Sequence, residues 1–548
     1  MAGFMVRIVL YFSLPLIISA QLKWTNLTSV NRGPSPSSRR DIAIGYDSKN
    51  KEILVYGGRA SGQIFSDTWA FNLNSGQWRE LNTSNDIGKR FSVVSGVWNN
   101  GFYVATGQVG SKFFDDMWRL DLSTSEWRQL PSGNSKPEKR YGAAGGFFQH
   151  DNSSFFYLTH GFASKRYSNT FVYDVSKEEG WKEVFEGTSS YNPNYPHARC
   201  LHSGTMLSTH KFVMYGGCLG GGGTGGPCPA DDGWTYDAGK DEWTRLPHCA
   251  SPRTYSAMAL LPIDKDSNGK DIVRAVLYGG SETSKSVITV TKAPPNELVI
   301  FNPETEEWAK KIVNGTAPPK RSGHAMVTVD NGIIMFGGSS SDDIWLLEGT
   351  AMMVENMPDG EECNLVYFSY IQLHGIFMFI GWGVLLQLGM FFARYFRNRD
   401  PWWFKMHRAL QVSGLIVSLM GFAFAVVSVP FDHFMFAHGG LGLVIMIIGL
   451  LQPLNAFFRP HKADESGQKS LKRMIWEIYH INAGRLALLL ALINISLGVF
   501  LAVVPYTAWV IWFVMFALWV TILIVMEIRL QYHRYKSGEG RMVEMTNK

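Results

Sequence analysis

Residues 52–78, EILVYGGRASGQIFSDTWAFNLNSGQW, hold the pattern that decides the fold of the first half of the chain. An apolar strand ends at Gly57 and Gly58, a polar loop follows, and a second strand with Trp69 leads through a turn to Trp78. Glycine permits close approach of strands and unusual φ values, and tryptophan fills the space between neighbouring sheets. The stretch therefore predicts strands of a small sheet that packs against others.

The same order recurs six times, at intervals of about fifty to sixty residues, which identifies an internal repeat. The glycine-ended strands are LVYGG to Gly58, YVATG to Gly107, YLTHG to Gly161, VMYGG to Gly217, VLYGG to Gly280 and IMFGG to Gly338. Each is preceded by an arginine that opens a strand: Arg40, Arg90, Arg140, Arg199, Arg253 and Arg321. The sixth copy stops after Trp345, and LKWTNL around Trp24 can supply its missing last strand. Such a closure leaves no exposed sheet edge.

This pattern resembles kelch repeats, whose hallmarks are paired glycines and two aromatics a fixed distance apart. The resemblance implies an all-β, six-bladed propeller over residues 21–350, and kelch propellers are mostly binding platforms. One group of extracellular oxidases with such repeats carries a copper site. In this sequence no set of Tyr, His and Cys residues can be assigned to such a site. The glycine run 220–226 predicts a flexible loop, because it lacks the P-loop pattern. We interpret the scattered histidines as solvated or locally hydrogen-bonded: His160, His197, His202, His210, His248 and His324.

Residues 1–20, MAGFMVRIVLYFSLPLIISA, predict a cleaved secretory signal peptide. Their apolar run is shorter than the ~20 residues that a spanning helix needs, which disfavours a signal anchor. Sequons in the first half agree with export and predict glycosylation at Asn26, Asn82, Asn152 and Asn314. The sequon at Asn494 falls in an apolar run, so it is expected to be unused.

Four of the five cysteines, Cys200, Cys218, Cys228 and Cys249, cluster in the exported half, as two disulfides in an oxidising compartment would require. We predict the pairs Cys218–Cys228 and Cys200–Cys249. Sequence alone allows three connectivities for four cysteines, and Cys363 is left over.

The second half is apolar enough for a membrane domain, and five runs are long enough to span a bilayer. They cover approximately 367–393, 406–429, 434–457, 475–502 and 506–528. Lysine and arginine gather in alternate connections and in the tail, whereas the connections VPFDHFMFA and VVPYTA contain neither. The positive-inside rule therefore predicts an extracellular propeller and a cytosolic C-terminus.

Four histidines fall near the starts of the first four spans: His374, His407, His438 and His480. Because successive spans run in opposite directions, they form an outer pair, His374 with His438, and an inner pair, His407 with His480. Polar side chains at membrane depth usually mark functional sites, although a single one can also be an interhelical hydrogen bond. Two imidazoles facing each other suit the axial ligation of haem iron better than zinc, since neither pair has a third and fourth ligand.

Residues 366–530 resemble the cytochrome b561 family, as in LHGIFMFIGWGVLLQLGMFFARYF and WEIYHINAGRLALLLALINISLGVF. The resemblance implies a four-helix di-haem core plus one helix, with His374 and His438 binding the outer haem b and His407 and His480 the inner one. Arg485 is a candidate contact for a haem propionate. Gln387 replaces a proline common in relatives, so we expect a straighter first helix. Residues 351–365 are predicted as a linker and 531–548 as a cytosolic tail.

The function that these features favour is electron transfer across a membrane, from an ascorbate-like cytosolic donor to an extracellular acceptor such as ferric iron or a redox partner. The propeller would dock that acceptor. The alternative is a membrane-anchored adhesion or receptor protein whose propeller binds a protein or carbohydrate ligand. A net charge of +5 without a long basic run argues against nucleic-acid binding. After export the plasma membrane is the expected location, and an endosomal or vacuolar membrane stays open.

Overall fold

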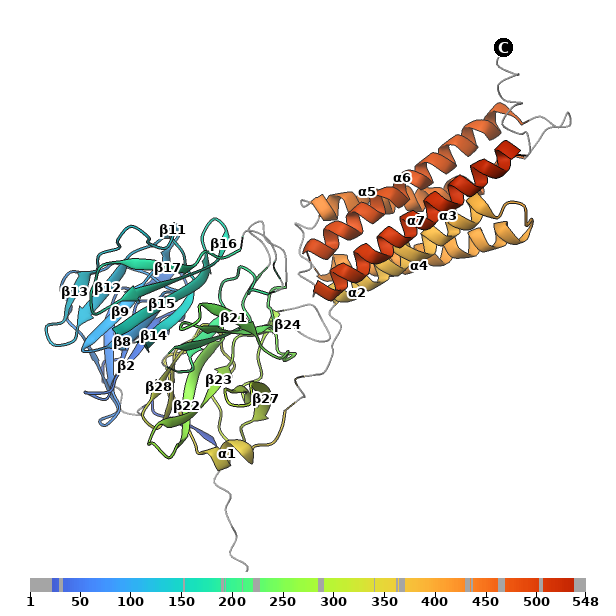
Figure 1. Ribbon diagram of the computed structural model, residues 1–548. Helices are drawn as coiled ribbons and strands as arrows, with labels where there is room; N and C mark the ends of the chain where they lie inside the picture. Colours follow the sequence, from blue (N-terminus) through green and yellow to red (C-terminus); the bar gives the residue numbers. More distant parts are fainter. Residues whose placement is uncertain are drawn as a thin grey trace, which may run out of the picture.

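Figure 1 shows two bodies, a β-sheet body formed by the first half of the chain and a bundle of long helices formed by the second. The computed structural model describes residues 22–28, 33–150, 153–188, 192, 194–208, 210–219, 227–283, 290–339, 341–360, 363, 370–428, 434, 437–461, 469–501 and 506–536. The predictions for the signal peptide, Asn152, the glycine run 220–226 and the end of the tail lie outside these residues.

The first body is a propeller of six four-stranded antiparallel sheets, which confirms the predicted fold class. Blade 1 contains β2 (Ala43–Asp47), β3 (Glu52–Tyr56), β6 (Thr68–Asn72) and β7 (Gln77–Glu80); blade 2 contains β8 (Val94–Trp98), β9 (Gly101–Ala105), β12 (Met117–Asp121) and β13 (Glu126–Gln129). Blade 3 contains β14 (Ala144–His150), β15 (Ser153–Phe162), β16 (Arg166–Asp174) and β17 (Trp181–Phe185); blade 4 contains β18 (Ser203–Met206), β19 (Lys211–Tyr215), β20 (Gly233–Asp237) and β21 (Glu242–Arg245). Blade 5 contains β22 (Ala257–Lys265), β23 (Asp271–Tyr278), β26 (Glu297–Asn302) and β27 (Glu307–Ile312); blade 6 contains β28 (Ala325–Val329), β29 (Gly332–Phe336), β30 (Ile344–Glu348) and β1 (Lys23–Asn26). Short hairpins extend three loops: β4 (Arg59–Ala60) with β5 (Gln63–Ile64), β10 (Gln108–Val109) with β11 (Lys112–Phe113), and β24 (Ser281–Thr283) with β25 (Val290–Lys292).

The ring of blades is closed in two ways. The N-terminal strand β1 pairs with β30, with Trp24 opposite Leu347, which confirms the predicted closure. Six residues, one from each blade, also form a continuous circle of backbone hydrogen bonds, and all six have φ between 52° and 71°. Around the circle they are Asp41, Ser92, Gly142, Leu201, Tyr255 and Gly323. We call this the axial ring, since every blade contributes one residue to it.

A buried arginine ties each blade together two residues before its axial-ring residue. None of the six is more than 2% exposed: Arg39, Arg90, Arg140, Arg199, Arg253 and Arg321. In four blades the guanidinium contacts both oxygens of an aspartate that also accepts the indole N–H of a tryptophan two residues later. In the first blade the predicted arginine is wrong by one residue: Arg39 occupies the buried position, and Arg40 does not.

The disulfides differ in part from the prediction. The structure joins Cys218 to Cys228, as predicted, and Cys249 to Cys363. The predicted Cys200–Cys249 pair is wrong, and Cys200 is a buried free thiol. The reason is topological: Cys200 lies opposite Cys218 in a short antiparallel bridge, whereas Cys249 follows the last strand of blade 4, where Ala250 N–H donates to the carbonyl of Cys363 at 2.8 Å.

The segment predicted as a linker packs along blade 5 before the chain enters the helical bundle. It begins with the short helix α1 (Ala351–Glu355). Gly360 N–H donates to the carbonyl of Lys310 at 2.8 Å, and Asp359 pairs with Lys311 at 2.6 Å. Together with the disulfide at Cys363, these contacts fix the chain to the propeller seven residues before Tyr370, the first described residue of the helical bundle.

Peptide mapping tests this connectivity directly. Protein alkylated in denaturant without reduction and then digested is expected to yield the crosslinked peptides Cys218–Cys228 and Cys249–Cys363, with only Cys200 alkylated. In a Cys363→Ser variant, Cys249 should become alkylated while the Cys218–Cys228 crosslink persists. A crosslink between Cys200 and Cys249 in the unmodified protein would contradict the structure.

Buried histidines are expected to make the propeller sensitive to acid, and burial lowers the pKa of all three, His160, His202 and His324. Burial, with a smaller effect of the neighbouring arginine, lowers the pKa of His202 beside Arg199 and that of His324 beside Arg321 to about 3. Asp232 raises the pKa of His202 and Asp343 raises that of His324, but both effects are smaller than that of burial. The unfolded chain binds protons near pH 6.5 and the folded one does not, so stability falls as pH drops from 6.5 towards 3.

Each of these histidines is therefore expected to remove about 2 kcal/mol of stability between pH 7 and pH 5. His202→Asn and His324→Asn should each reduce the loss by that amount, because asparagine does not titrate. Urea unfolding of the full chain in detergent at pH 7 and at pH 5 measures this loss of stability. The exposed His210 provides the matched control, and His210→Asn should leave the pH dependence unchanged. If all three variants kept the pH dependence of the wild-type stability, the buried histidines would not be its origin.

The second body contains five helical spans that are long and apolar enough to cross a membrane, by length and composition. The first comprises α2 (Tyr370–Met378), the π-helix η1 (Phe379–Leu385) and α3 (Leu386–Tyr395). The others are α4 (Trp402–Ser428), α5 (Ala437–Phe457), α6 (Leu471–Leu501) and α7 (Tyr506–Lys536). The sequence predicts a straighter first helix from Gln387, and the structure contains a π-helix within this span, where Gly381 packs against Ser418 of α4.

Candidate functional site

Two of the four predicted histidines face each other near the start of α2. The end of the bundle where α2 begins lies beside the propeller (Figure 1). His374 lies on α2 and His438 on α5, and we call them the propeller-side pair. Their ring centres are 6.1 Å apart and their planes meet at 83°. A metal ion lies about 2 Å from a coordinating imidazole nitrogen, so this separation leaves room for one metal ion between the rings.

The other two histidines lie towards the opposite end of the bundle. His407 is in the second turn of α4 and His480 in the third turn of α6, and we call them the distal pair. The two side chains are close enough to interact electrostatically. Since the pairs lie at opposite ends of the bundle, the structure arranges the four histidines in two layers.

Hydrogen bonds fix the orientation of three of the four rings. Nδ1 of His374 contacts the carbonyl oxygen of Gly421 at 2.9 Å, Nδ1 of His407 that of Gly389 at 2.9 Å, and Nδ1 of His438 that of Asn494 at 3.0 Å. A carbonyl only accepts, so each Nδ1 carries the proton and each Nε2 is left with a lone pair. This is the arrangement that ligating histidines use.

The surroundings of the histidines fit a haem. At Gly498 a Cβ atom would come within 2.9 Å of His438 Cε1, so the absent side chain leaves room at that ring. Near the distal pair both side-chain polar atoms of Gln452 are buried without a hydrogen-bond partner in the described part of the chain, and they face Gly484, one turn after His480. Among the described residues no three His, Cys, Asp or Glu side chains could hold a metal ion, which disfavours zinc.

Arg485 is not on the same side of α6 as its neighbour His480. Five residues along a helix correspond to a rotation of about 140°. The side chain is exposed, and it interacts electrostatically with Tyr395 at the end of α3. The contact of Arg485 with a haem propionate therefore stays a prediction.

The sequence analysis missed Trp476, which stacks on His480 with ring centres 4.9 Å apart and planes at 9°. Its indole N–H donates to the carbonyl of Asn455 on α5 at 2.7 Å. The available signal was a spacing of four residues, which places the two rings on one face of a helix.

The propeller provides no comparable site among its described residues. His160, His202 and His324 are buried and not solvated, and His160 makes the local hydrogen bond that the interpretation allows, between its Nδ1 and Thr159 Oγ1 at 2.7 Å. His160 and His202 pack together with ring centres 5.5 Å apart, and no third metal ligand joins them in the described chain. The candidate glycosylation sites Asn26, Asn82 and Asn314 are exposed, as attachment of a sugar would require.

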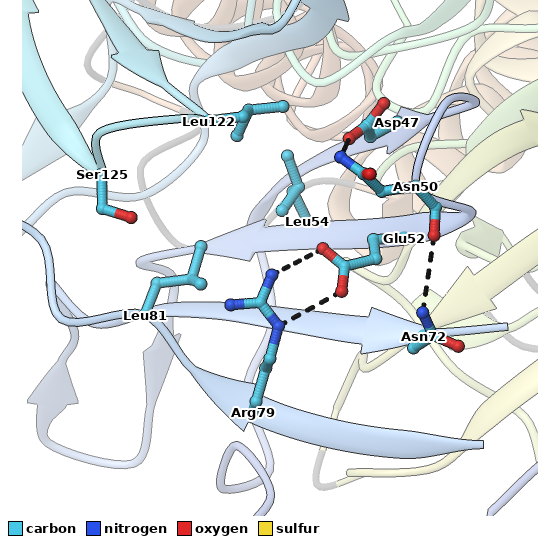
Figure 2. A pocket seen from close by; sticks show the side chains of 9 residues that line it. All are labelled: Asp47, Asn50, Glu52, Leu54, Asn72, Arg79, Leu81, Leu122 and Ser125. Carbon is cyan, nitrogen blue, oxygen red and sulfur yellow. Dashed lines mark hydrogen bonds and ion pairs between the residues drawn. The ribbon is translucent and has the colours of Figure 1, made fainter. Parts of the chain in front are cut away.

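A polar cleft of about 310 Å³ opens between blades 1 and 2 (Figure 2). Its charged and amide groups are already paired with one another. Arg79 contacts both carboxylate oxygens of Glu52 at 2.7 and 3.2 Å, and Asn50 donates to Asp47 at 2.7 Å. Because these lining groups are hydrogen-bonded to one another, we do not assign a ligand to the cleft.

The two bodies define a class of protein in which a closed β-propeller is joined to a membrane bundle with two layers of paired histidines. A family model described as the KLHDC2/KLHL20/DRC7 Kelch-repeats domain matches residues 11–217 and 188–338. These matches cover more than half of the chain, and the chain belongs to the kelch-repeat family.

The helical half is similar to cytochrome b561 proteins. A cytochrome b561 and DOMON domain-containing protein of Arabidopsis thaliana is 37% identical over 134 residues, which are 24% of this chain and 34% of that protein. A second one from the same organism is 34% identical over 136 residues, 24% of this chain and 31% of the relative. A Drosophila melanogaster protein named "Putative ferric-chelate reductase 1 homolog" is 32% identical over 151 residues, 26% of this chain and 22% of the relative. This chain thus spans between 22% and 34% of the length of these relatives, and the similarity supports haem b binding and electron transfer at the level of the family.

Proposed function

We propose that this protein carries electrons across a membrane through two b-type haems, one at each histidine pair. The observation that carries the proposal is the orientation of His374, His407 and His438, whose Nδ1 protons are donated to backbone carbonyls, so that Nε2 is the nitrogen that carries the lone pair. A haem iron with two imidazole ligands supplies one-electron transfer and has no coordination position for oxygen chemistry.

In this proposal the protein scaffold does three things. The backbone carbonyls of Gly421, Gly389 and Asn494 hold the tautomer and the plane of their histidines. Apolar side chains such as Trp382 and Leu386 fill the bundle between the two layers and exclude water. Gln452 places an unpaired amide beside the distal pair, where it suits a propionate.

The proposed direction follows from the charges. Arginines and lysines gather at the distal end of the bundle, as in Arg394, Lys405 and Lys472. The positive-inside rule then puts the distal pair near the cytosol and the propeller outside. An ascorbate-like donor would reduce the distal site, and an extracellular acceptor such as ferric iron would oxidise the propeller-side site. The ferric-chelate name of one relative supports that class of acceptor.

The propeller is proposed to dock the acceptor at its axis. Next to the axial ring, Arg40 and Arg59 form a bridge and share the carboxylate of Asp41, at 3.0 and 2.7 Å. Their guanidinium groups lie over the rings of Tyr255 and Phe91, at 4.7 and 4.3 Å. Two cations that share one carboxylate suit an anionic acceptor.

Reconstituted vesicles test the proposed function. With ascorbate inside and a ferric chelate outside, the purified full-length protein should reduce the external iron faster than protein-free vesicles do. His407→Ala should return the rate to that of empty vesicles. A haem-loaded protein that gives no rate above empty vesicles would contradict transmembrane transfer, and a folded protein without haem would favour the receptor alternative.

A further inference from the structure

One candidate haem ligand is held differently from the other three. Nδ1 of His480 is buried and has no hydrogen-bond partner in the described part of the chain, whereas the other three histidines contact a backbone carbonyl through this atom. The His480 ring instead lies parallel to the indole of Trp476, with ring centres 4.9 Å apart and planes at 9°. Stacking thus takes the place of the hydrogen bond at this position.

The stacked indole is itself fixed from two helices. Its N–H donates to the carbonyl of Asn455 on α5 at 2.7 Å. The guanidinium groups of Arg473 and Arg459 lie over the indole, at 4.8 and 5.6 Å from its ring centre. A ring that is hydrogen-bonded at its edge and covered by cations cannot rotate freely.

Arg473 is rigid as well. It is 4% exposed, its Nε donates to Glu477 at 2.9 Å, and its Nη1 donates to the carbonyl of Pro460 at 2.9 Å. Arg473, Trp476, His480 and Gly484 lie on one face of α6, because they are spaced by three or four residues. The side chains therefore form a continuous stack along α6: Arg473 lies over Trp476, and Trp476 lies over His480.

We propose that Trp476 is the positioning residue of His480, whose imidazole plane it fixes by stacking where the other three ligands use a hydrogen bond. The inference rests on the proposed function, because His480 is taken as a ligand of the distal haem. Outer groups that orient a ligand also tune the metal that it binds. The properties of the distal haem, and not those of the propeller-side haem, should therefore depend on the ring at position 476.

The test uses full-length protein in detergent, loaded with haem. Trp476→Leu removes the ring, and Trp476→Phe keeps a ring that can stack but removes the N–H donor. Trp512→Leu is the matched control: Trp512 is 5% exposed, donates to Ser496 Oγ at 3.1 Å, and touches none of the four histidines in the described structure. The readouts are the haem-to-protein ratio, the electron paramagnetic resonance signals of the two ferric haems, and their midpoint potentials.

We expect Trp476→Leu to shift the resonance signal and the midpoint potential of the distal haem, or to lose that haem, while the propeller-side haem keeps wild-type values. Trp476→Phe should restore the wild-type distal signal, and Trp512→Leu should change neither haem. Unchanged distal signals in Trp476→Leu would overturn the proposal, as would a Trp476→Phe variant that behaves like Trp476→Leu. Wild-type protein without haem would overturn the proposed function itself, whereas wild-type protein with two haems and an insensitive position 476 overturns only this inference.

Discussion

Replacing His407 with alanine is expected to halve the haem content of the purified protein and to abolish electron transfer across the membrane. His407 is held by the carbonyl of Gly389 on the neighbouring helix, and alanine in its place offers the distal pair no ligand atom. His374→Ala should likewise remove the propeller-side haem and keep the distal one. The haem-to-protein ratio and the rate of external iron reduction by loaded vesicles measure both effects.

His533→Ala is the control for these variants. His533 is exposed in the last turn of α7 and belongs to neither pair. This variant should keep the full haem content and the wild-type rate. If His407→Ala and His374→Ala both kept the wild-type haem content, the assignment of the two pairs would be wrong.

Replacing Arg199 with methionine is expected to destabilise the propeller by about 3–5 kcal/mol, because it leaves a carboxylate without its partner in the protein interior. Arg199 is fully buried and contacts Asp232 at 2.7 and 2.6 Å and the carbonyls of Gly216 and His197 at 2.9 and 3.0 Å. The paired arginine, together with hydrogen bonds, overcomes burial and lowers the pKa of Asp232 to about 2. The loss is a large fraction of the free energy of unfolding of a typical domain, about 5–15 kcal/mol, so we expect poor export of the variant.

Arg128 offers the matched control. It pairs with Glu178 at 2.7 and 2.8 Å, but its side chain is 51% exposed, and such pairs contribute about 0–1 kcal/mol. Arg128→Met should therefore be exported like the wild type. Urea unfolding of the full chain measures the difference, and a double variant Arg199→Met, Asp232→Leu should be less destabilised than Arg199→Met alone. If Arg199→Met and Arg128→Met were equally stable, the buried ion pair would contribute no more to the stability of the propeller than the exposed one.

The repeat and the histidine layers were predictable because both are periodic in the sequence. Six glycine-ended strands, each with an arginine ahead of it, define six blades, and the spacing of four histidines across antiparallel spans defines two layers. The position of one arginine was not predictable, because Arg39 and Arg40 are adjacent and only packing decides which is buried.

The pairing of Cys249 was not predictable for a different reason. It depends on the chain following blade 5, where Gly360 contacts Lys310 and Asp359 pairs with Lys311, and these contacts leave no pattern in the sequence. The stack of Trp476 on His480 was visible as a spacing of four residues, but a tryptophan in an apolar helix is more often a packing residue. Arg485 lies about 140° around α6 from His480, so closeness in sequence does not place the two side chains on one face of the helix.

The most direct test of the central claim is an absorption spectrum of the purified wild-type protein, recorded oxidised and then after addition of ascorbate, together with a haem-to-protein ratio. The account predicts two b-type haems per chain and their reduction by ascorbate. A folded, full-length protein that binds no haem when haem is supplied during expression would contradict it.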